Sequence, residues 1–253
     1  VDCPLKGKGP RDLDMVFVRE NTEGEYAGVG GRVRQGTPDE TVVQTSVFTR
    51  RITEKLMRYA FELTRSRAEE RQARGLKTAS KVTSVTKSNA LNHSLVFWDE
   101  VFAELKSDYA EVETDQYHVD AMSMYMIQRP EDFDVVVASN LFGDILTDLG
   151  GVLQGGLGFA AGGNLNPERD YPSMFEPVHG SAPTIAGKNA ANPIAMVWTV
   201  KLMLDFLGHT EAAGSVLTAI EKLVTGDRSG LTADMGGTGT TSGVGDLLLQ
   251  ALE

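Results

Sequence analysis

The sequence has a single cysteine, Cys3, among its 253 residues. One cysteine excludes an internal disulfide and any metal site built from several thiolates, and it favours a reducing compartment, so we expect a cytoplasmic protein. Positive charge is also scarce, because 24 basic residues stand against 35 acidic ones and leave a net charge of -11. This balance argues against a nucleic acid or an anionic membrane surface as the partner.

Long apolar runs are missing as well. The most apolar stretch, residues 193–207, is interrupted by Lys201 and Asp205, and it is shorter than the roughly 18 residues that a membrane span needs. No basic segment followed by an apolar core stands at the start, so no secretory signal is visible. The chain opens with Val1 in a polar stretch rich in glycine and proline, and we expect it to be cut from a longer chain.

What is present is the composition of a globular protein, with 41% apolar and 23% charged residues. At about 150 residues per domain, the length predicts one large domain or two modest ones. Glycine supplies seven of the fourteen residues from 150 to 163, which predicts a boundary between domains 1–150 and 151–253.

Apolar periodicity predicts strands that alternate with helices, the pattern of an α/β fold. We expect strands at 14–18, 41–49, 77–85 and 134–139, helices at 50–67, 89–108, 119–128, 141–149, 193–207 and 215–224, a charge-dense connector at 68–75, and a final tail rich in glycine and threonine. The first strand ends in a polar loop, 19–26, and such loops on rigid scaffolds often carry function.

A pair of carboxylates is the first candidate site. Asp144 and Asp148 are four residues apart on a predicted helix, so both project from one face. They follow the apolar run 135–137, and sites in parallel sheets form at the carboxyl ends of strands. Hard oxygen ligands suit Mg²⁺ or Mn²⁺. Asp120, at another predicted helix start, is either a third ligand or an N-cap, and a solvated acidic face is the plain alternative for the pair.

Three further residues are suited to chemistry on a carboxylic acid. Lys87 lies between a predicted strand and a predicted helix, where a lysine with a lowered pKa can act as a base, although an ordinary surface lysine is the better interpretation of this residue taken alone. Tyr26 can donate a proton, and Arg19 can clamp a carboxylate.

Two other enzyme classes are disfavoured because the sequence does not match their motifs. The run 179–188 superficially resembles a phosphate-binding loop, but Ala182 stands where the first glycine is required and Asn189 where serine or threonine is required. A magnesium-dependent phosphoryl-transfer enzyme is therefore a weak alternative. No G-x-S-x-G elbow is present, which disfavours a serine hydrolase.

Four motifs in order carry a family resemblance. They are RENTEGEY at 19–26, TKSN at 86–89, NLFGD at 140–144 with Asp148, and EPVHGSAP at 176–183. Together they resemble the β-decarboxylating dehydrogenases, which act on isocitrate, isopropylmalate, and tartrate or D-malate. The resemblance covers nearly the whole chain and is strongest to the tartrate/D-malate branch.

The resemblance implies oxidative decarboxylation of a 2-hydroxy acid bearing a β-carboxylate, with NAD as hydride acceptor. It implies Mg²⁺ or Mn²⁺ on Asp120, Asp144 and Asp148, Lys87 as the base, Tyr26 as proton donor to the enol carbon, and Arg19 on the β-carboxylate. It also implies cofactor contacts, with Asn89 beside the nicotinamide and His179, Gly180, Ser181, Ala182 and Asn192 on the adenosine side. Thr184 stands where NAD-preferring members usually have an acidic residue, and NAD remains the favoured cofactor.

The resemblance further implies an isocitrate/isopropylmalate dehydrogenase-like fold with two open α/β domains. Residues 1–150 would be the small domain, which holds the substrate, the metal and the dimer contacts, with an intersubunit β arm at 31–50. Residues 151–253 would be the last part of the large, cofactor-binding domain, whose first part the chain lacks. In the implied homodimer, Lys87 and Asp120 complete the partner's site. The alternatives are an isopropylmalate or isocitrate dehydrogenase and, in a different class, an inactive or regulatory partner subunit.

Overall fold

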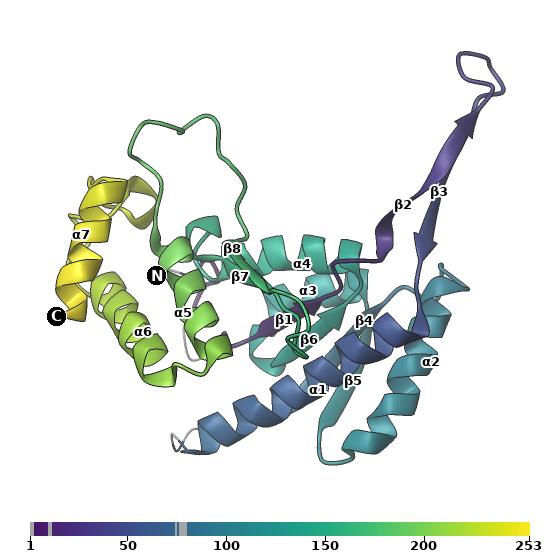
Figure 1. The fold of residues 1–253 in the computed structure, drawn as a ribbon, viewed down its shortest axis with the longest axis horizontal. Coiled ribbons are helices and arrows are strands. Elements are labelled where there is room, and N and C mark those ends of the chain that lie inside the picture. Colours follow the sequence, from purple (N-terminus) through teal and green to yellow (C-terminus); the bar gives the residue numbers. More distant parts are fainter. Residues whose placement is uncertain (1–2, 10–11, 74, 76–79) are drawn as a thin grey trace. The chain divides into compact units, whose positions relative to one another are not determined.

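A four-stranded parallel sheet is the centre of the first half of the chain (Figure 1). Its strands are β1 (Val16–Arg19), β4 (Lys81–Thr86), β5 (Glu113–His118) and β6 (Val135–Ala138), in the order β1-β6-β4-β5. All three pairings between neighbours are parallel. The carboxyl ends of the four strands therefore meet at one edge of the sheet, which we call the carboxyl edge.

The computed structural model describes residues 3–9, 12–73, 75 and 80–253. The chain divides into two compact units. One unit is Pro10–Leu149, and the other is Gly150–Glu253 together with the segment before Pro10.

Helices cover both faces of the sheet in the first unit. They are α1 (Arg50–Ala73), α2 (Ser94–Lys106), α3 (Val119–Gln128) and α4 (Asn140–Leu153). The chain moves from β4 to its neighbour β5 through α2, and then back over β4 to β6 through α3. Because such crossovers are right-handed, opposite directions of travel place α2 and α3 on opposite faces.

The sheet core is apolar on both faces. Val135, Val136 and Val137 of β6 are fully buried, as expected for a central strand of a parallel sheet. Beneath α1 and α2, the ring of Phe61 stacks on Phe102 and Tyr109, with centroids 5.7 and 4.5 Å apart. This aromatic stack joins α1 to the end of α2.

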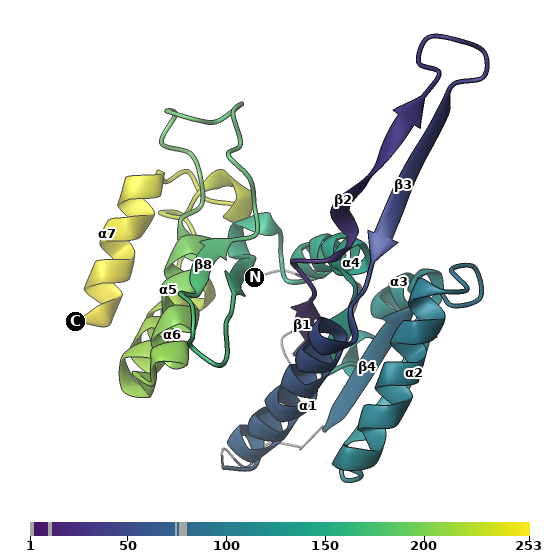
Figure 2. The ribbon, with the colours of Figure 1, turned by 45° about the vertical axis from the view of Figure 1, so that its right-hand side comes forward.

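An antiparallel hairpin projects from the first unit (Figure 2). Its strands, β2 (Gly24–Val33) and β3 (Thr41–Val47), are exposed along most of their length. Gly30 permits their close approach, since a Cβ at this position would lie 2.2 Å from the Val43 carbonyl oxygen. The expected arm at 31–50 is therefore a hairpin that already starts at Gly24.

The second unit contains a short antiparallel pair, β7 (Ala161–Asn164) with β8 (Met174–Pro177), and helices α5 (Ile194–Leu207), α6 (Thr210–Thr225) and α7 (Thr241–Leu252). Apolar side chains from these helices, from the loops between them and from the turn before β7 form its core, namely Phe159, Ile194, Ile220, Leu231, Met235, Val244 and Leu248. Four 3₁₀ turns complete the described elements of the chain: Ser107–Tyr109, Pro130–Asp132, Leu157–Phe159 and Ala233–Met235.

Several element predictions were wrong in detail. The expected connector at 68–75 is helical as far as Ala73, because α1 continues through it. The final tail holds α7, which starts after Thr240, whose side chain accepts a hydrogen bond from the Gly243 N–H at 3.2 Å. The polar strand β5 was not expected. The strand expected at 77–85 begins at Lys81, and residues 77–79 lie outside the described part.

No helix in the described ranges is both long and apolar enough to cross a membrane.

Candidate active site

Two pairs of opposite charge lie at the carboxyl edge of the sheet. Arg19, the last residue of β1, places Nη1 2.6 Å from Oδ1 of Asp144 on α4. Lys87, directly after β4, places Nζ 2.8 Å from Oδ1 of Asp120, which follows β5. The strand order accounts for this pairing, because β1 neighbours β6, which leads into α4, and β4 neighbours β5.

The Arg19 guanidinium is oriented by more than its charge. Its Nε and Nη2 donate to Oδ1 of Asn140 at 3.2 and 2.8 Å. Its aliphatic stem crosses α4 at Gly143, where an added Cβ would lie 2.5 Å from Cγ of Arg19. The missing side chain of Gly143 thus allows the arginine to lie across the helix.

Tyr26 joins the first pair from the hairpin. Its hydroxyl donates to Oδ2 of Asp144 at 3.3 Å, and the ring is about half exposed. Partial desolvation and the Asp144 carboxylate raise the pKa of Tyr26 above its ordinary value of 10.0. The phenol therefore keeps its proton at neutral pH, as a proton donor must.

The second pair holds an ionised carboxylate. A hydrogen bond from Lys87 is the largest cause that lowers the pKa of Asp120 below its ordinary value of 3.8. Asp120 lies in the first turn of α3, and His118 occupies the N-cap. The alternative role of Asp120 as the N-cap is therefore wrong.

The carboxylates of α4 are the candidates for holding a divalent cation. Asp144 and Asp148 lie one turn apart on α4, and Asp148 is exposed. Within the described ranges of one chain, no three His, Cys, Asp or Glu side chains come close enough to hold a metal. Mg²⁺ is commonly held by one or two carboxylates, with water and substrate oxygens completing the shell. The spacing of the pair on α4 matches that pattern, with Asp144 in contact with Arg19 and Asp120 in contact with Lys87 in this structure.

Three acidic residues of the segment 19–26 fix its path, a role the sequence analysis missed. Glu20 is buried and accepts from the N–H groups of Thr22 and Glu23 at 2.7 and 2.8 Å. Glu23 accepts from the N–H and the hydroxyl of Thr49, both at 2.8 Å. Glu25 reaches the start of α4. The sequence feature that could have indicated this role is the spacing of these acids within a loop that carries Arg19 and Tyr26.

The residues expected to contact the cofactor lie in both units. Asn89 is exposed, in a turn of the first unit after β4. His179, Gly180, Ser181 and Ala182 lie in the second unit, in the loop after β8, where Nδ1 of His179 is 3.0 Å from the Gly180 carbonyl oxygen.

Asn192 anchors the far end of that loop. Its Oδ1 accepts from the Ile194 N–H at 2.9 Å, and its Nδ2 donates to Asp234 at 2.9 Å. A Cβ at Gly158 would lie 2.8 Å from the Asn192 amide nitrogen, so the backbone passes close by. Asn192 is therefore a buried residue that ties the end of the loop to Asp234. Asp234 and Gly158 were not expected from the sequence.

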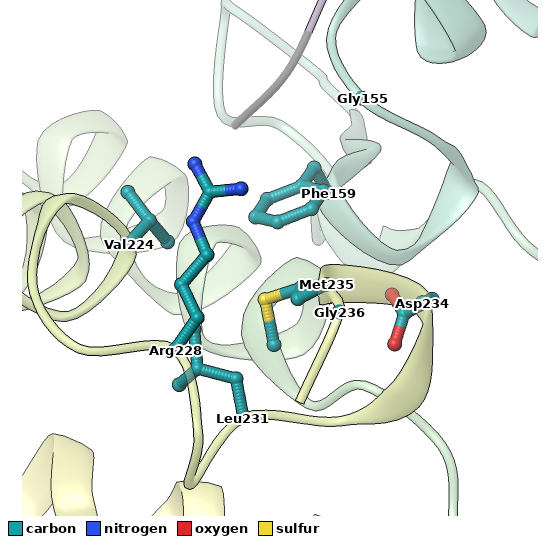
Figure 3. Close-up of a pocket in the computed structure, with 8 residues that line it drawn as sticks. All are labelled: Gly155, Phe159, Val224, Arg228, Leu231, Asp234, Met235 and Gly236. Atoms are coloured by element: carbon teal, nitrogen blue, oxygen red, sulfur yellow. The ribbon is translucent and has the colours of Figure 1, made fainter. Parts of the chain in front are cut away.

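A cavity of about 350 Å³ lies in the second unit (Figure 3). Phe159, Leu231 and Met235 line it together with Arg228, and the Arg228 guanidinium extends toward the Phe159 ring. None of the residues expected to bind the cofactor lines this cavity, and Asp234 connects its wall to Asn192.

Comparison with known proteins identifies the class. The family model for isocitrate/isopropylmalate dehydrogenase matches residues 1–248. A Bacillus subtilis protein named probable tartrate dehydrogenase/decarboxylase is 50% identical over 244 residues, which cover 96% of this chain and 65% of the relative. D-malate dehydrogenase (decarboxylating) of Escherichia coli is 49% identical over 257 residues, which cover 100% of this chain and 68% of the relative.

A solved structure agrees with this match. The crystal structure of isocitrate dehydrogenase from Methylococcus capsulatus superposes with a TM-score of 0.83 at 37% identity, and the match covers 95% of this chain and 68% of that one. The chain belongs to the isocitrate/isopropylmalate dehydrogenase family, so the family resemblance and the α/β fold expected from the sequence are confirmed. The chain spans about two thirds of the length of these relatives, 65% in the case of the Bacillus protein.

Proposed function

We propose that the protein catalyses the metal-dependent oxidative decarboxylation of a 2-hydroxy acid of the D-malate or tartrate type, with NAD as the hydride acceptor. The observation that carries the proposal is the pair of charge clusters at the carboxyl edge. Arg19, Tyr26 and Asp144 form one cluster, and Lys87 and Asp120 form the other. The names of the relatives from Bacillus subtilis and Escherichia coli favour tartrate and D-malate.

In this mechanism, Arg19 binds the carboxylate on C3 of the acid, since its guanidinium presents paired donors. Lys87 would take the proton of the C2 hydroxyl, and NAD, when bound, would supply the acceptor for the C2 hydride. The C3 carboxylate then leaves as CO₂, and its bonding electrons form the enolate. Tyr26 returns a proton to C3, and the product is a 2-oxo acid.

A divalent cation on Asp144 and Asp148 would act as a Lewis acid toward the C2 oxygen. Asp120 is the proposed third carboxylate. Because Asp120 lies with Lys87 and apart from the α4 pair within one chain, we propose that this second cluster acts in the site of a partner subunit in a homodimer. His179, Gly180, Ser181, Ala182 and Asn192 are proposed for the adenosine part of NAD, and Asn89 for the nicotinamide part.

NADH formation tests the function directly. D-malate, tartrate, isopropylmalate and isocitrate are supplied one at a time with and without Mn²⁺, both to this chain and to a fusion that adds the upstream region of a relative. Turnover of one acid that requires Mn²⁺ and is lost in Lys87→Met supports the proposal. Absence of turnover with all four acids in both proteins, while they remain folded, contradicts it and favours an inactive partner subunit.

A further inference from the structure

Tyr26 is held in place by few contacts of its own. Its ring is 54% exposed, its bond to Asp144 is long at 3.3 Å, and the Arg19 guanidinium lies 6.0 Å from the ring centroid. These contacts hold the half-exposed ring only weakly against α4. Something beside it must therefore fix the backbone from which it projects.

The neighbouring residue, Glu25, makes the firm contacts. Its Oε1 accepts from the Ser139 hydroxyl at 2.8 Å, and its Oε2 accepts from the Leu141 N–H at 3.1 Å. Ser139 is fully buried at the end of β6, and Leu141 lies in the first turn of α4. Both donors are thus parts of the rigid scaffold that also carries Asp144.

The placement of this carboxylate suits its charge. The first N–H groups of a helix lack partners within the helix, and the helix dipole favours a negative charge at this end. Hydrogen bonds to an ionised acceptor are also stronger than neutral ones. Glu25 therefore joins the first residues of β2 to the start of α4, one turn before Asp144.

We propose that Glu25 is a positioning residue that holds the Tyr26 hydroxyl against Asp144. The proposal rests on the proposed function for its kinetic consequence, but its structural consequence can be measured without activity. Glu25 touches no reacting atom, and it acts through the backbone that it shares with Tyr26.

Three substitutions separate positioning from general stability. Glu25→Ala removes both acceptor oxygens. Glu25→Gln keeps one oxygen for the Leu141 N–H, and its amide can donate to the Ser139 hydroxyl. Glu104→Ala is the matched control, because Glu104 is likewise a carboxylate, but it lies exposed on α2 and pairs with Arg50.

Fluorine NMR of the full chain labelled with fluorotyrosine reports the position of the ring. The sequence has six tyrosines, and Tyr26→Phe identifies the signal of Tyr26 by its loss. We expect Glu25→Ala to shift and broaden that signal, and Glu25→Gln and Glu104→Ala to leave it in place. An unmoved Tyr26 signal in folded Glu25→Ala overturns the proposal. If Glu25→Ala does not fold, Ser139→Ala removes one of the two donors and should move the same signal by a smaller amount, and no movement there overturns the proposal as well.

Turnover gives the second measurement. Tyr26 is proposed for the protonation of C3 and not for binding, so Glu25→Ala should lower kcat about tenfold or more while KM changes less than twofold. In a double-mutant cycle with Tyr26→Phe, the two losses should be strongly non-additive, because both act on one hydroxyl. Additive losses overturn the positioning role. If the unsubstituted protein turns over none of the acids, the proposed function fails while the NMR result still decides the role of Glu25.

Discussion

Gly143 shows how a residue without a side chain decides where a charged one can lie. The stem of Arg19 occupies the space that a Cβ at this position would fill. Arg19 in turn makes its ion pair with Asp144 and its bonds to Asn140 from that position. The absence of a side chain at Gly143 therefore determines the direction in which the Arg19 guanidinium points.

Gly143→Ala should therefore displace Arg19 and weaken the binding of the acid. The loss of a charged hydrogen bond is worth about 1.5–3 kcal/mol, so KM should rise roughly ten- to hundredfold. Steady-state kinetics with the preferred acid measures this change.

Gly245→Ala is the matched control for this substitution. Gly245 also lies within a helix, and a Cβ there would meet no atom within 4 Å. It should gain up to about 1 kcal/mol of helix propensity without a change in KM. Equal KM values for the two variants would show that Arg19 does not depend on Gly143.

At the scale of elements, an ionic cluster anchors α1 at the amino edge of the sheet, where the parallel strands begin. Asp14, before β1, lies 2.8 Å from Arg67 and 2.6 Å from Arg71, both on α1. Asp134, before β6, lies 2.8 and 2.9 Å from the same two arginines. The helix that supports the sheet is thus tied to the starts of two neighbouring strands.

This cluster should make stability depend on acid pH. Partial burial alone would raise the pKa of Asp14, but the Arg67 and Arg71 guanidinium groups outweigh it and lower the pKa below its ordinary value of 3.8. Since the folded state has the lower pKa, the stabilisation is present above pH 3.8 and is lost as the pH falls through the folded value. Asp14→Asn should lower Tm at neutral pH. The difference in Tm between this variant and the unsubstituted protein should shrink as the pH falls below 3.8. A difference in Tm that stays constant with pH would contradict this view.

The hairpin offers a second test at this scale. Gly30→Ala places a Cβ 2.2 Å from a backbone oxygen of β3, which cannot move without breaking the strand pairing, whereas a Cβ at Gly31 meets nothing within 4 Å. If the hairpin is the intersubunit arm, Gly30→Ala should raise the dimer dissociation constant about tenfold or more. Sedimentation velocity at several concentrations measures this, with Gly31→Ala as the control. Equal dimer dissociation constants for the two variants would show that the hairpin does not lie in the dimer interface.

The elements also show what a sequence can and cannot predict. The run Val135–Val137 predicted β6, and the position of Asp144 after it predicted a place at the carboxyl edge, because both are local patterns. Strand β5 was missed because its residues, from Glu113 to His118, are mostly polar and it lies at the edge of the sheet. Without β5, residue patterns alone could not predict the contact of Asp120 with Lys87, although the family resemblance had already assigned both residues to one site.

The role of Glu25 was equally hidden from the sequence. Its partners, Ser139 and Leu141, are more than a hundred residues away, and only the folded sheet brings them to β2. Positions of candidate residues along the chain were therefore accessible from patterns, while their partners depended on tertiary structure.

At the scale of the whole molecule, the charged site residues fall into two clusters. One chain supplies Arg19, Tyr26 and Asp144 together, and Lys87 and Asp120 together, but no group of three metal-ligating side chains among the residues described. A homodimer in which each site takes one cluster from each subunit would bring the carboxylates together.

Subunit complementation distinguishes sites shared between subunits from sites that lie within one subunit. Lys87→Met and Asp144→Asn subunits, each inactive alone, are mixed under conditions that exchange subunits, and NADH formation is measured with Mn²⁺ and the preferred acid. If the sites are shared, every mixed dimer regains one intact site, so a random mixture should recover about a quarter of the unsubstituted activity. If each site lies within one subunit, every site in the mixed dimer carries a substitution, and a mixture that forms dimers but stays inactive would contradict the account.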